Sequence, residues 1–362
     1  MGKKLTILLL TLAGLLVLSG GYVVVGLQAY TRYQGDILAN QENCGGQPPV
    51  HICVRAPSAI FSAFYPAYVA SHNALFVIEY SSDNPVTLLV SVNIPGFSQV
   101  QTHTVNATPT LQSVSFAPPL LNQILYSFTA EDNTSLHVQV TDTQGHSYYV
   151  NDSLLLLHSR WLMQWIASNR LRIAAWVTPH DPAVTDLVAK AAVYLPTEPA
   201  PAPKAMVGYD EASRKQVSDQ VDAIFDTMRS DYHIQYVQAS VPYGGPADSS
   251  AAIQNIKLPW EVLQQRSGMC VELTVLLASA VESIGLHSEI VIIPGHAFLG
   301  VALTPDEQHF QYWDAVLVNN NVAGGSANVY ADAIYAYNMK QHTILDTILI
   351  SDARKAQIDP MI

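Results

Sequence analysis

The chain has 362 residues, of which 49% are hydrophobic and 13% are charged, and its formal net charge is −12 at pH 7. This length predicts about two domains, and the hydrophobic share excludes a globally disordered chain. The negative charge argues against nucleic acid as a partner, because phosphate binding needs clustered Lys and Arg.

The N-terminus has the composition of a membrane helix. Residues 5–27 contain no charged side chain, and at 1.5 Å per residue they would form roughly 34 Å of helix, enough to cross a bilayer. A cleaved signal peptide is the alternative, but its apolar core is usually about 7–15 residues long. Because Lys3 and Lys4 precede the run, we expect residues 1–28 to be a single-pass anchor with the bulk of the chain extracytoplasmic.

The chain has three cysteines. Cys44 and Cys53 flank a Gly- and Pro-rich turn, which favours a small disulfide loop in an oxidising compartment, with two free thiols as the alternative. We expect residues 29–56 to form a stalk that carries this loop. The pairing leaves Cys270 without a partner, and an unpaired thiol outside the cytoplasm calls for an explanation.

Residues 57–152 have the pattern of an all-β domain. Short runs rich in Val, Leu, Phe, Tyr and Thr, such as residues 86–92 and 135–140, alternate with turn signals such as residues 82–85. Regularly spaced strands of this kind predict an antiparallel β-sandwich. We find no helical periodicity and no catalytic constellation here, and such a domain could bind an unknown surface partner.

Helical patterns follow the predicted sandwich. Residues 159–169 have a helical composition and are expected to bridge the domains. Asp181 followed by Pro182 predicts a capped helix that extends to about Tyr194. Residues 210–230 form an amphipathic pattern. Its apolar positions are Val217, Val221, Ile224, Phe225 and Met228.

Cys270 begins a long apolar run that Gly285 ends. The run predicts a buried helix with the cysteine in its first turn. The N-terminus of a helix carries roughly half a positive charge, which stabilises a thiolate and so favours a nucleophile. The alternative is a small apolar cysteine with a purely structural role.

Two further polar residues follow in neighbouring predicted strands. His296 comes directly after an apolar strand and a Pro-Gly turn, and Asp314 follows Trp313 in the next strand. A carboxylate among aromatic residues is expensive to bury unless it accepts hydrogen bonds, and an imidazole N–H is a suitable donor. The alternative for His296 is a core or turn histidine without a catalytic role. A thiol, an imidazole and a carboxylate in this order suit nucleophilic catalysis.

Residues 258–314 resemble the core of the transglutaminase-like superfamily, which has a papain-like cysteine hydrolase fold, and are similar to a bacterial membrane-anchored branch of it. The motifs that carry this resemblance are Gly268-Met269-Cys270, Gly295-His296-Ala297 and Trp313-Asp314. The resemblance covers about residues 170–340 and implies an α+β fold with a transglutaminase-like domain at 153–362. It implies Cys270 as nucleophile, His296 as general base and acid, and Asp314 as the orienting acid.

Two features of the family pattern are less well matched. Asp314 is followed by Ala315 and Val316 rather than by the Pro or Thr common in the family, and Asp306 is a poorer substitute for the acid. The family also uses an upstream aromatic or amide donor beside the backbone N–H of the cysteine as an oxyanion hole. The candidates for that donor are Gln235, Tyr236 and Trp260.

These observations predict an extracytoplasmic cysteine acyl-transfer enzyme, a peptidase or amidase that acts on a protein or peptide through a thioester. A protein-crosslinking transglutaminase and a catalytically inactive surface binding or structural protein are the alternatives. We expect no cofactor and no metal, because the histidines and cysteines lack metal-ligand spacing.

Overall fold

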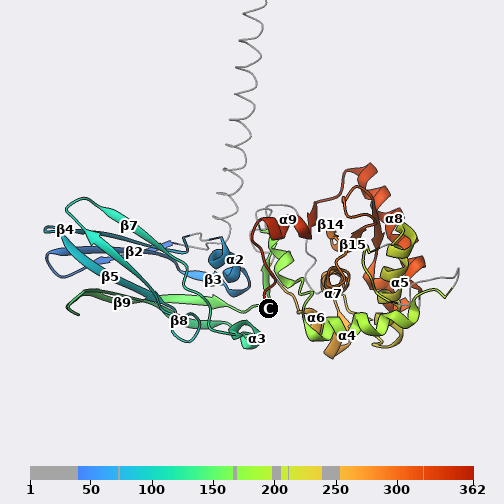
Figure 1. The fold of residues 1–362 in the computed structure, drawn as a ribbon, viewed down its shortest axis with the longest axis horizontal. Helices are drawn as coiled ribbons and strands as arrows, with labels where there is room; N and C mark the ends of the chain where they lie inside the picture. The colour runs from blue at the N-terminus through green and yellow to red at the C-terminus, as the bar shows by residue number, and fades with distance from the viewer. Residues whose placement is uncertain are drawn as a thin grey trace, which may run out of the picture.

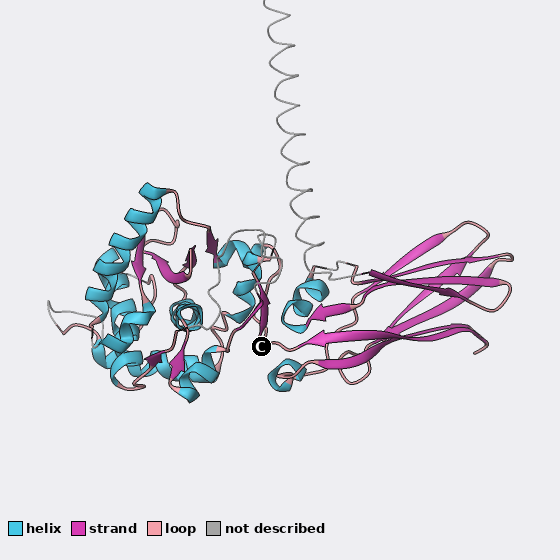
Figure 2. Ribbon diagram, turned by 180° about the vertical axis from the view of Figure 1, so that it is seen from behind, coloured by secondary structure: helices cyan, strands magenta, loops and turns pink. Residues whose placement is uncertain are grey.

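The computed structural model describes residues 40–71, 74–165, 169–197, 205–210, 212–238, 253–320 and 322–362. They form one lobe made mostly of strands and a second lobe in which helices surround a small sheet (Figure 1 and, from behind, Figure 2). The expected α+β class is therefore confirmed.

The anchor predicted at residues 1–28 lies outside the described residues. None of the described helices combines the length and the apolar character needed to cross a membrane.

The first lobe consists of two sheets. One has the strand order β1-β2-β4-β7 and the other β3-β9-β8-β5-β6. All neighbouring strands are antiparallel except β3 and β9. The strands are β1 (Asn40–Gly45), β2 (Val50–Pro57), β3 (Ala59–Phe61), β4 (Phe76–Ser82), β5 (Val86–Asn93), β6 (Gln101–Ala107), β7 (Gln112–Phe116), β8 (Asp132–Asp142) and β9 (Ser147–His158).

The two sheets share a core because alternate residues of their strands are apolar. In β4, Phe76 and Ile78 are buried, and they belong to the same cluster as Leu88 and Val90 of β5 and Val138 of β8. This is the arrangement expected of the predicted sandwich.

The segment expected to be a stalk is part of this lobe. Its described residues, 40–56, form most of β1 and β2, and Val50, Ile52 and Val54 point into the core. Apolar residues alternate regularly in β2, which is typical of a strand. The Gly- and Pro-rich turn between β1 and β2 nevertheless favoured the prediction of a stalk over that of a β-hairpin. Further along, β9 runs to His158, so the predicted domain boundary at residue 152 falls within a strand.

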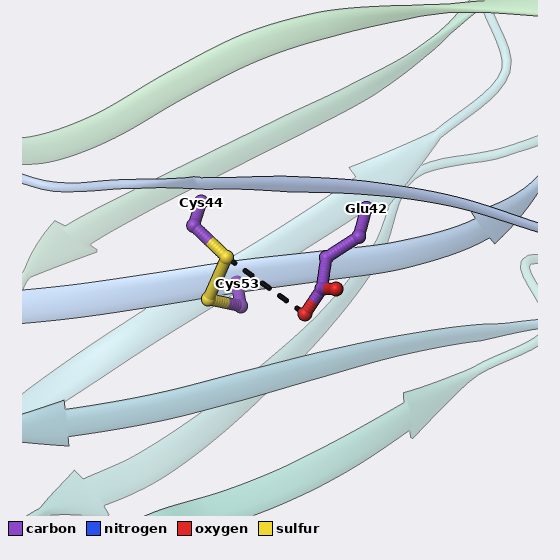
Figure 3. A group of neighbouring side chains, drawn as sticks. All are labelled: Glu42, Cys44 and Cys53. Carbon is purple, nitrogen blue, oxygen red and sulfur yellow. Dashed lines mark hydrogen bonds between the residues drawn. A yellow bond between two sulfur atoms is a disulfide. The ribbon is translucent and has the colours of Figure 1, made fainter.

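The predicted disulfide is confirmed. Cys44 in β1 lies directly opposite Cys53 in β2, and their sulfurs are bonded (Figure 3). The carboxylate of Glu42 lies beside the bridge, 3.9 Å from the Cys44 sulfur. Disulfides persist in oxidising compartments, so the bridge agrees with an extracytoplasmic position for this lobe.

Some short elements differ from the sequence expectation. The first lobe contains η1 (Ser62–Phe64), α2 (Tyr65–Ala70) and α3 (Ile124–Ser127), although no helix was predicted there. The bridge expected to be helical contains β10 (Leu162–Gln164) instead, which pairs with β12 (Ile253–Asn255). A strand partner far away in the sequence overrides the local helical preference.

The second lobe is built around one helix. It contains η2 (Arg170–Trp176), α4 (Pro182–Ala191), η3 (Ala192–Tyr194), α5 (Arg214–Ser230), α6 (Pro259–Gln265), α7 (Cys270–Ser283), η4 (Ala315–Asn320), α8 (Gly324–Gln341) and α9 (Ile350–Lys355). Figure 1 shows α7 end-on at the centre, and α4, α5, α6 and the sheet pack around it. The cap at Asp181 is confirmed, because its side chain accepts a hydrogen bond from the Ala183 N–H. The predicted apolar face of α5 is buried.

A four-stranded sheet, ordered β16-β15-β14-β17, lies beside α7. Its strands are β14 (Ser288–Ile293), β15 (His296–Ala302), β16 (Phe310–Trp313) and β17 (Asp346–Leu349). All of β14 is buried, with Ile290 and Ile292 in the cluster that contains α7 and Val291 and Ile293 in the cluster that contains Ala331 of α8. The sheet is thus covered on both faces, which explains why its sequence is a continuous apolar run.

A buried ion pair joins the two lobes. Arg160 lies two residues after β9, the last strand of the first lobe, and its guanidinium lies 2.9 Å from both carboxylate oxygens of Glu261 in α6. Arg160 is fully buried, and the Trp161 indole also donates to Glu261. A buried charge pair with this bidentate geometry fixes the relative placement of the segments that carry it.

Candidate active site

Cys270 is the first residue of α7 and is 4% exposed. Glu272 orders this helix start: its carboxylate accepts hydrogen bonds of 2.8 Å from the backbone N–H groups of Met269 and Lys257. The thiol is unpaired. It lies at the positive end of the helix dipole.

His296 begins β15 because a tight hairpin precedes it. Ile293 and His296 pair across the turn, and Gly295 between them has a φ of 75°, which a side chain would disfavour. Pro followed by Gly suits such a turn. The hairpin therefore places the imidazole at the end of the sheet, where its side chain is 22% exposed.

Asp314 directly follows β16 and is the hydrogen-bond partner of His296. Leu299 of β15 pairs with Trp313, so Asp314 lies at the same end of the sheet as His296. The imidazole Nε2 is 2.9 Å from Asp314 Oδ2, and Asp314 Oδ1 accepts a hydrogen bond from the Val316 N–H. Both oxygens of this buried carboxylate are satisfied, which offsets its desolvation.

The third member of the group, Cys270, interacts with the same imidazole. Burial alone would lower the pKa of His296, but hydrogen bonds with Asp314 and Cys270 and their charges raise it to about 10. Since Nε2 faces Asp314, Nδ1 is the nitrogen left for the sulfur. The structure thus brings together all three residues of the predicted site, and the interactions with Asp314 and Cys270 favour the positively charged form of the ring.

Thr274 links the two elements that carry the thiol and the imidazole. Its hydroxyl lies 2.8 Å from the Cys270 carbonyl oxygen and 3.2 Å from the Ala297 carbonyl oxygen. It therefore ties the first turn of α7 to the residue after His296. Sequence reasoning did not select Thr274; its spacing of four from Cys270 places it on the same helix face.

Of the oxyanion candidates, Tyr236 lies at the site. It belongs to β11 (Gln235–Tyr236), which pairs in parallel with β13 (Ser267–Gly268), so Tyr236 is opposite Gly268, two residues before the cysteine. Burial, followed by the nearby charges of Cys270 and Asp314, raises the pKa of Tyr236. Its hydroxyl therefore stays protonated and able to donate.

Gln235, Trp260 and Asp306 do not join the group formed by Cys270, His296 and Asp314. Gln235 precedes Tyr236 on the strand and so points the opposite way; it is exposed, and its amide donates to the His233 carbonyl. Trp260 is half-buried on α6, and its indole Nε1 is buried without a hydrogen-bond partner among the described residues. Asp306 is exposed in a loop, where it accepts from Thr304 and Gln308, so it does not replace Asp314.

Asp222 supports β16, the strand that precedes Asp314. Its carboxylate accepts a hydrogen bond of 2.8 Å from the Trp313 indole, and it fills the space where a side chain at Gly324 would lie. Burial, with repulsion from neighbouring acidic residues, raises its pKa to about 6. Sequence reasoning did not select Asp222, which lies between the buried Val221 and Ala223 in α5.

One group in the described part of the chain has three potential metal ligands, namely Glu42, Cys44 and Cys53. The two sulfurs are joined in the disulfide, so they offer no thiolate to a metal.

No protein-family model matches this chain, and no curated protein matches it either.

Proposed function

We propose that this protein is an extracytoplasmic cysteine hydrolase of the transglutaminase-like type, which cleaves an amide or peptide bond through a thioester. The observation that carries the proposal is the hydrogen bond between His296 and Asp314 beside the unpaired thiol at the start of α7. A buried carboxylate behind an imidazole that faces a thiol is the arrangement that nucleophilic catalysis requires.

In the first half-reaction the Cys270 thiolate attacks the carbonyl carbon of the substrate and forms a carbon–sulfur bond. The negative charge moves to the carbonyl oxygen, which the Tyr236 hydroxyl and the backbone N–H of Cys270 stabilise by hydrogen bonding. Protonated His296 gives its proton to the leaving nitrogen, the carbon–nitrogen bond breaks, and an amine departs. A thioester on Cys270 remains.

In the second half-reaction His296 acts as a base. It takes a proton from a water molecule as the oxygen attacks the thioester carbon, and the carbon–sulfur bond then breaks. The products are a carboxylic acid and the Cys270 thiolate beside the protonated ring. Because water is always present, hydrolysis needs no second binding site, whereas crosslinking would need a site for an acceptor amine.

The proposed location is the outer side of a membrane. The bridge between Cys44 and Cys53 supports an oxidising compartment, and the uncharged run at residues 5–27 after two lysines supports an N-terminal anchor. An anchored enzyme of this kind would act on protein or peptide substrates at the cell surface.

The test is the reactivity of the thiol. The full chain in detergent is treated with iodoacetamide between pH 4 and 9, and labelling of Cys270 is followed by mass spectrometry. We expect labelling at pH values well below those at which a free cysteine reacts, and none in Cys270→Ala. His296→Ala should shift the profile toward that of a free thiol. A thiol that reacts only after unfolding would overturn the proposal and leave a non-catalytic surface protein.

A further inference from the structure

The end of β15 that carries the imidazole has no strand partner on its β16 side. In the described part of the chain, the pairing of β15 with β16 begins at Leu299 and Trp313, so no residue of β16 lies opposite Ala297. Ala297 directly follows His296 and is fully buried. On this side, the position of the main chain beside the imidazole therefore depends on contacts other than a strand ladder.

The register shows which way the Ala297 carbonyl points. In an antiparallel sheet, successive residues direct their N–H and C=O groups to opposite neighbours in alternation. The Leu303 N–H bonds to the carbonyl of His309, just before β16. The Ala302 N–H bonds to the carbonyl of His287, just before β14. Because Ala297 and Leu303 are an even number of residues apart, the Ala297 carbonyl faces the β16 side, where the pairing has ended.

The hydroxyl of Thr274 supplies a hydrogen bond to this carbonyl. Thr274 is fully buried in α7, and its hydroxyl oxygen lies 3.2 Å from the Ala297 carbonyl oxygen and 2.8 Å from that of Cys270. In an α-helix the carbonyl of Cys270 also accepts from the Thr274 N–H, so it is satisfied without the hydroxyl. The buried Ala297 carbonyl would lose a hydrogen bond without it, at a cost in free energy.

Thr274 and Asp314 act on different parts of the site. Asp314 contacts ring Nε2 of His296 and so orients the imidazole. Thr274 instead contacts the main chain beside each reacting group: the carbonyl of Cys270 and that of Ala297. Its hydroxyl therefore acts on the separation of the thiol and the imidazole rather than on the direction in which the ring points.

We propose that Thr274 is a positioning residue of the site: its hydroxyl holds the start of β15 against the first turn of α7 and so sets the distance between the Cys270 thiol and the His296 imidazole. This inference rests on the proposed function, since it assumes that the thiol and the imidazole act as a pair. The attraction between a thiolate and an imidazolium falls as their separation grows. A longer distance would therefore raise the pH at which the thiol becomes reactive.

The test compares the parent with Thr274→Val and Thr274→Ser, each as the full chain in detergent. Valine keeps the shape of threonine but replaces the hydroxyl by a methyl group, whereas serine keeps the hydroxyl. Iodoacetamide labelling, in which the Cys270 sulfur displaces iodide, is followed by mass spectrometry between pH 4 and 9. We expect Thr274→Val to react about 10-fold more slowly at neutral pH, with its profile moved to higher pH. Thr274→Ser should stay within about threefold of the parent.

Thr227→Val is the matched control. Thr227 is also fully buried, in α5, and its hydroxyl lies 2.8 Å from the carbonyl oxygen of Ala223, four residues earlier. The change removes the same bond within a helix without removing a bond between α7 and β15, so labelling should stay within about twofold of the parent. Urea denaturation shows whether each variant is folded during labelling. If Thr274→Val is not, Thr274→Ala and Thr227→Ala replace the two valine variants.

The outcomes separate the two proposals. If iodoacetamide labels the parent readily but Thr274→Val reacts like the parent or like Thr227→Val, the assignment of Thr274 is wrong and the proposed hydrolase stands. The same holds if Thr274→Ser is slowed as much as Thr274→Val, because the hydroxyl would then not be responsible. If iodoacetamide does not label the folded parent, both proposals are wrong.

Discussion

His296 Nε2 lies 2.9 Å from Asp314 Oδ2, although His296 begins β15 and Asp314 follows β16, and the Asp314 side chain is buried whereas the imidazole is 22% exposed. The contact turns the other ring nitrogen toward Cys270, whose interaction contributes to the raised pKa of the imidazole. Asp314 thus acts on the imidazole in two separable ways: its hydrogen bond orients the ring, and its charge raises the pKa of the ring.

The first prediction separates these contributions. Asp314→Asn keeps an oxygen that accepts from Nε2 but removes the charge, and it should lower the rate of Cys270 alkylation at neutral pH by about 10-fold. Asp314→Ala removes both and should lower the rate by about 100- to 1,000-fold. Equal rates in the two variants would mean that orientation by Asp314 contributes nothing.

The second prediction concerns Tyr236, the proposed hydrogen-bond donor to the negatively charged oxygen of the reacting carbonyl group. Tyr236→Phe removes one hydroxyl and leaves the ring, so turnover of an amide substrate should fall about 10- to 100-fold while KM changes little. The control is Tyr337→Phe, at a position in α8 that is 64% exposed. Unchanged turnover in Tyr236→Phe would remove this residue from the mechanism.

The third prediction is about stability. Glu261→Gln leaves the fully buried Arg160 without a counter-charge and should lower the free energy of unfolding by about 3–5 kcal/mol. The exposed pair of Asp352 and Lys355 provides the comparison, because Asp352→Asn should change stability by less than about 1 kcal/mol. Urea denaturation of the three proteins measures both effects, and similar midpoints would contradict the expectation.

The fourth prediction is a pH dependence that comes from Asp222. Because the pKa of Asp222 is raised to about 6 in the folded protein, the folded state holds this proton more tightly than the unfolded state, whose pKa is about 3.9. Stability contributed by the protonated form is therefore lost as pH rises from about 4 to about 6.

Asp222→Asn cannot ionise but can still accept from the Trp313 indole. Its melting temperature relative to the parent should rise between about pH 4 and 6 and stay constant above about pH 7. Thermal unfolding across this range measures the difference, and a difference that does not vary with pH would contradict the raised pKa.

The fifth prediction concerns the disulfide. Replacing Cys44 and Cys53 by Ala together should lower the stability of the first lobe by about 2–3 kcal/mol, because a short loop is no longer closed in the unfolded state. The bridge joins β1 and β2 in the other lobe from α7 (Figure 1), so Cys270 alkylation should keep its rate. A parallel loss of alkylation would show that the lobes do not fold independently of this bridge.

Features encoded within a few residues were predictable from the sequence. The helix that starts at Cys270, the Pro-Gly hairpin before His296 and the capped helix after Asp181 all depend on local periodicity, turn residues and caps, and all three are present. The α+β class follows from the same patterns.

Features that depend on pairing between distant segments were not predictable in this way. The strand at Leu162–Gln164 exists because it pairs with Ile253–Asn255 about 90 residues away, against a helical local composition. The segment expected to be a stalk forms strands because β2 pairs with β4. A single sequence shows the alternation of a strand but not the partner that satisfies its backbone.

At the site, local sequence patterns indicated which residues could do chemistry: a thiol at a helix start, an imidazole after a turn and an acid among aromatic residues. Which of these residues lie within hydrogen-bonding distance depends on the tertiary structure. In the folded chain Asp314, not Asp306, is hydrogen-bonded to His296, and Tyr236, not Gln235, lies near Cys270. Thr274 also contacts the residue after His296. Hydrogen bonds a few ångströms long require the relative placement of separate elements. Local propensity fixes each element, but only packing around α7 fixes the distances between them.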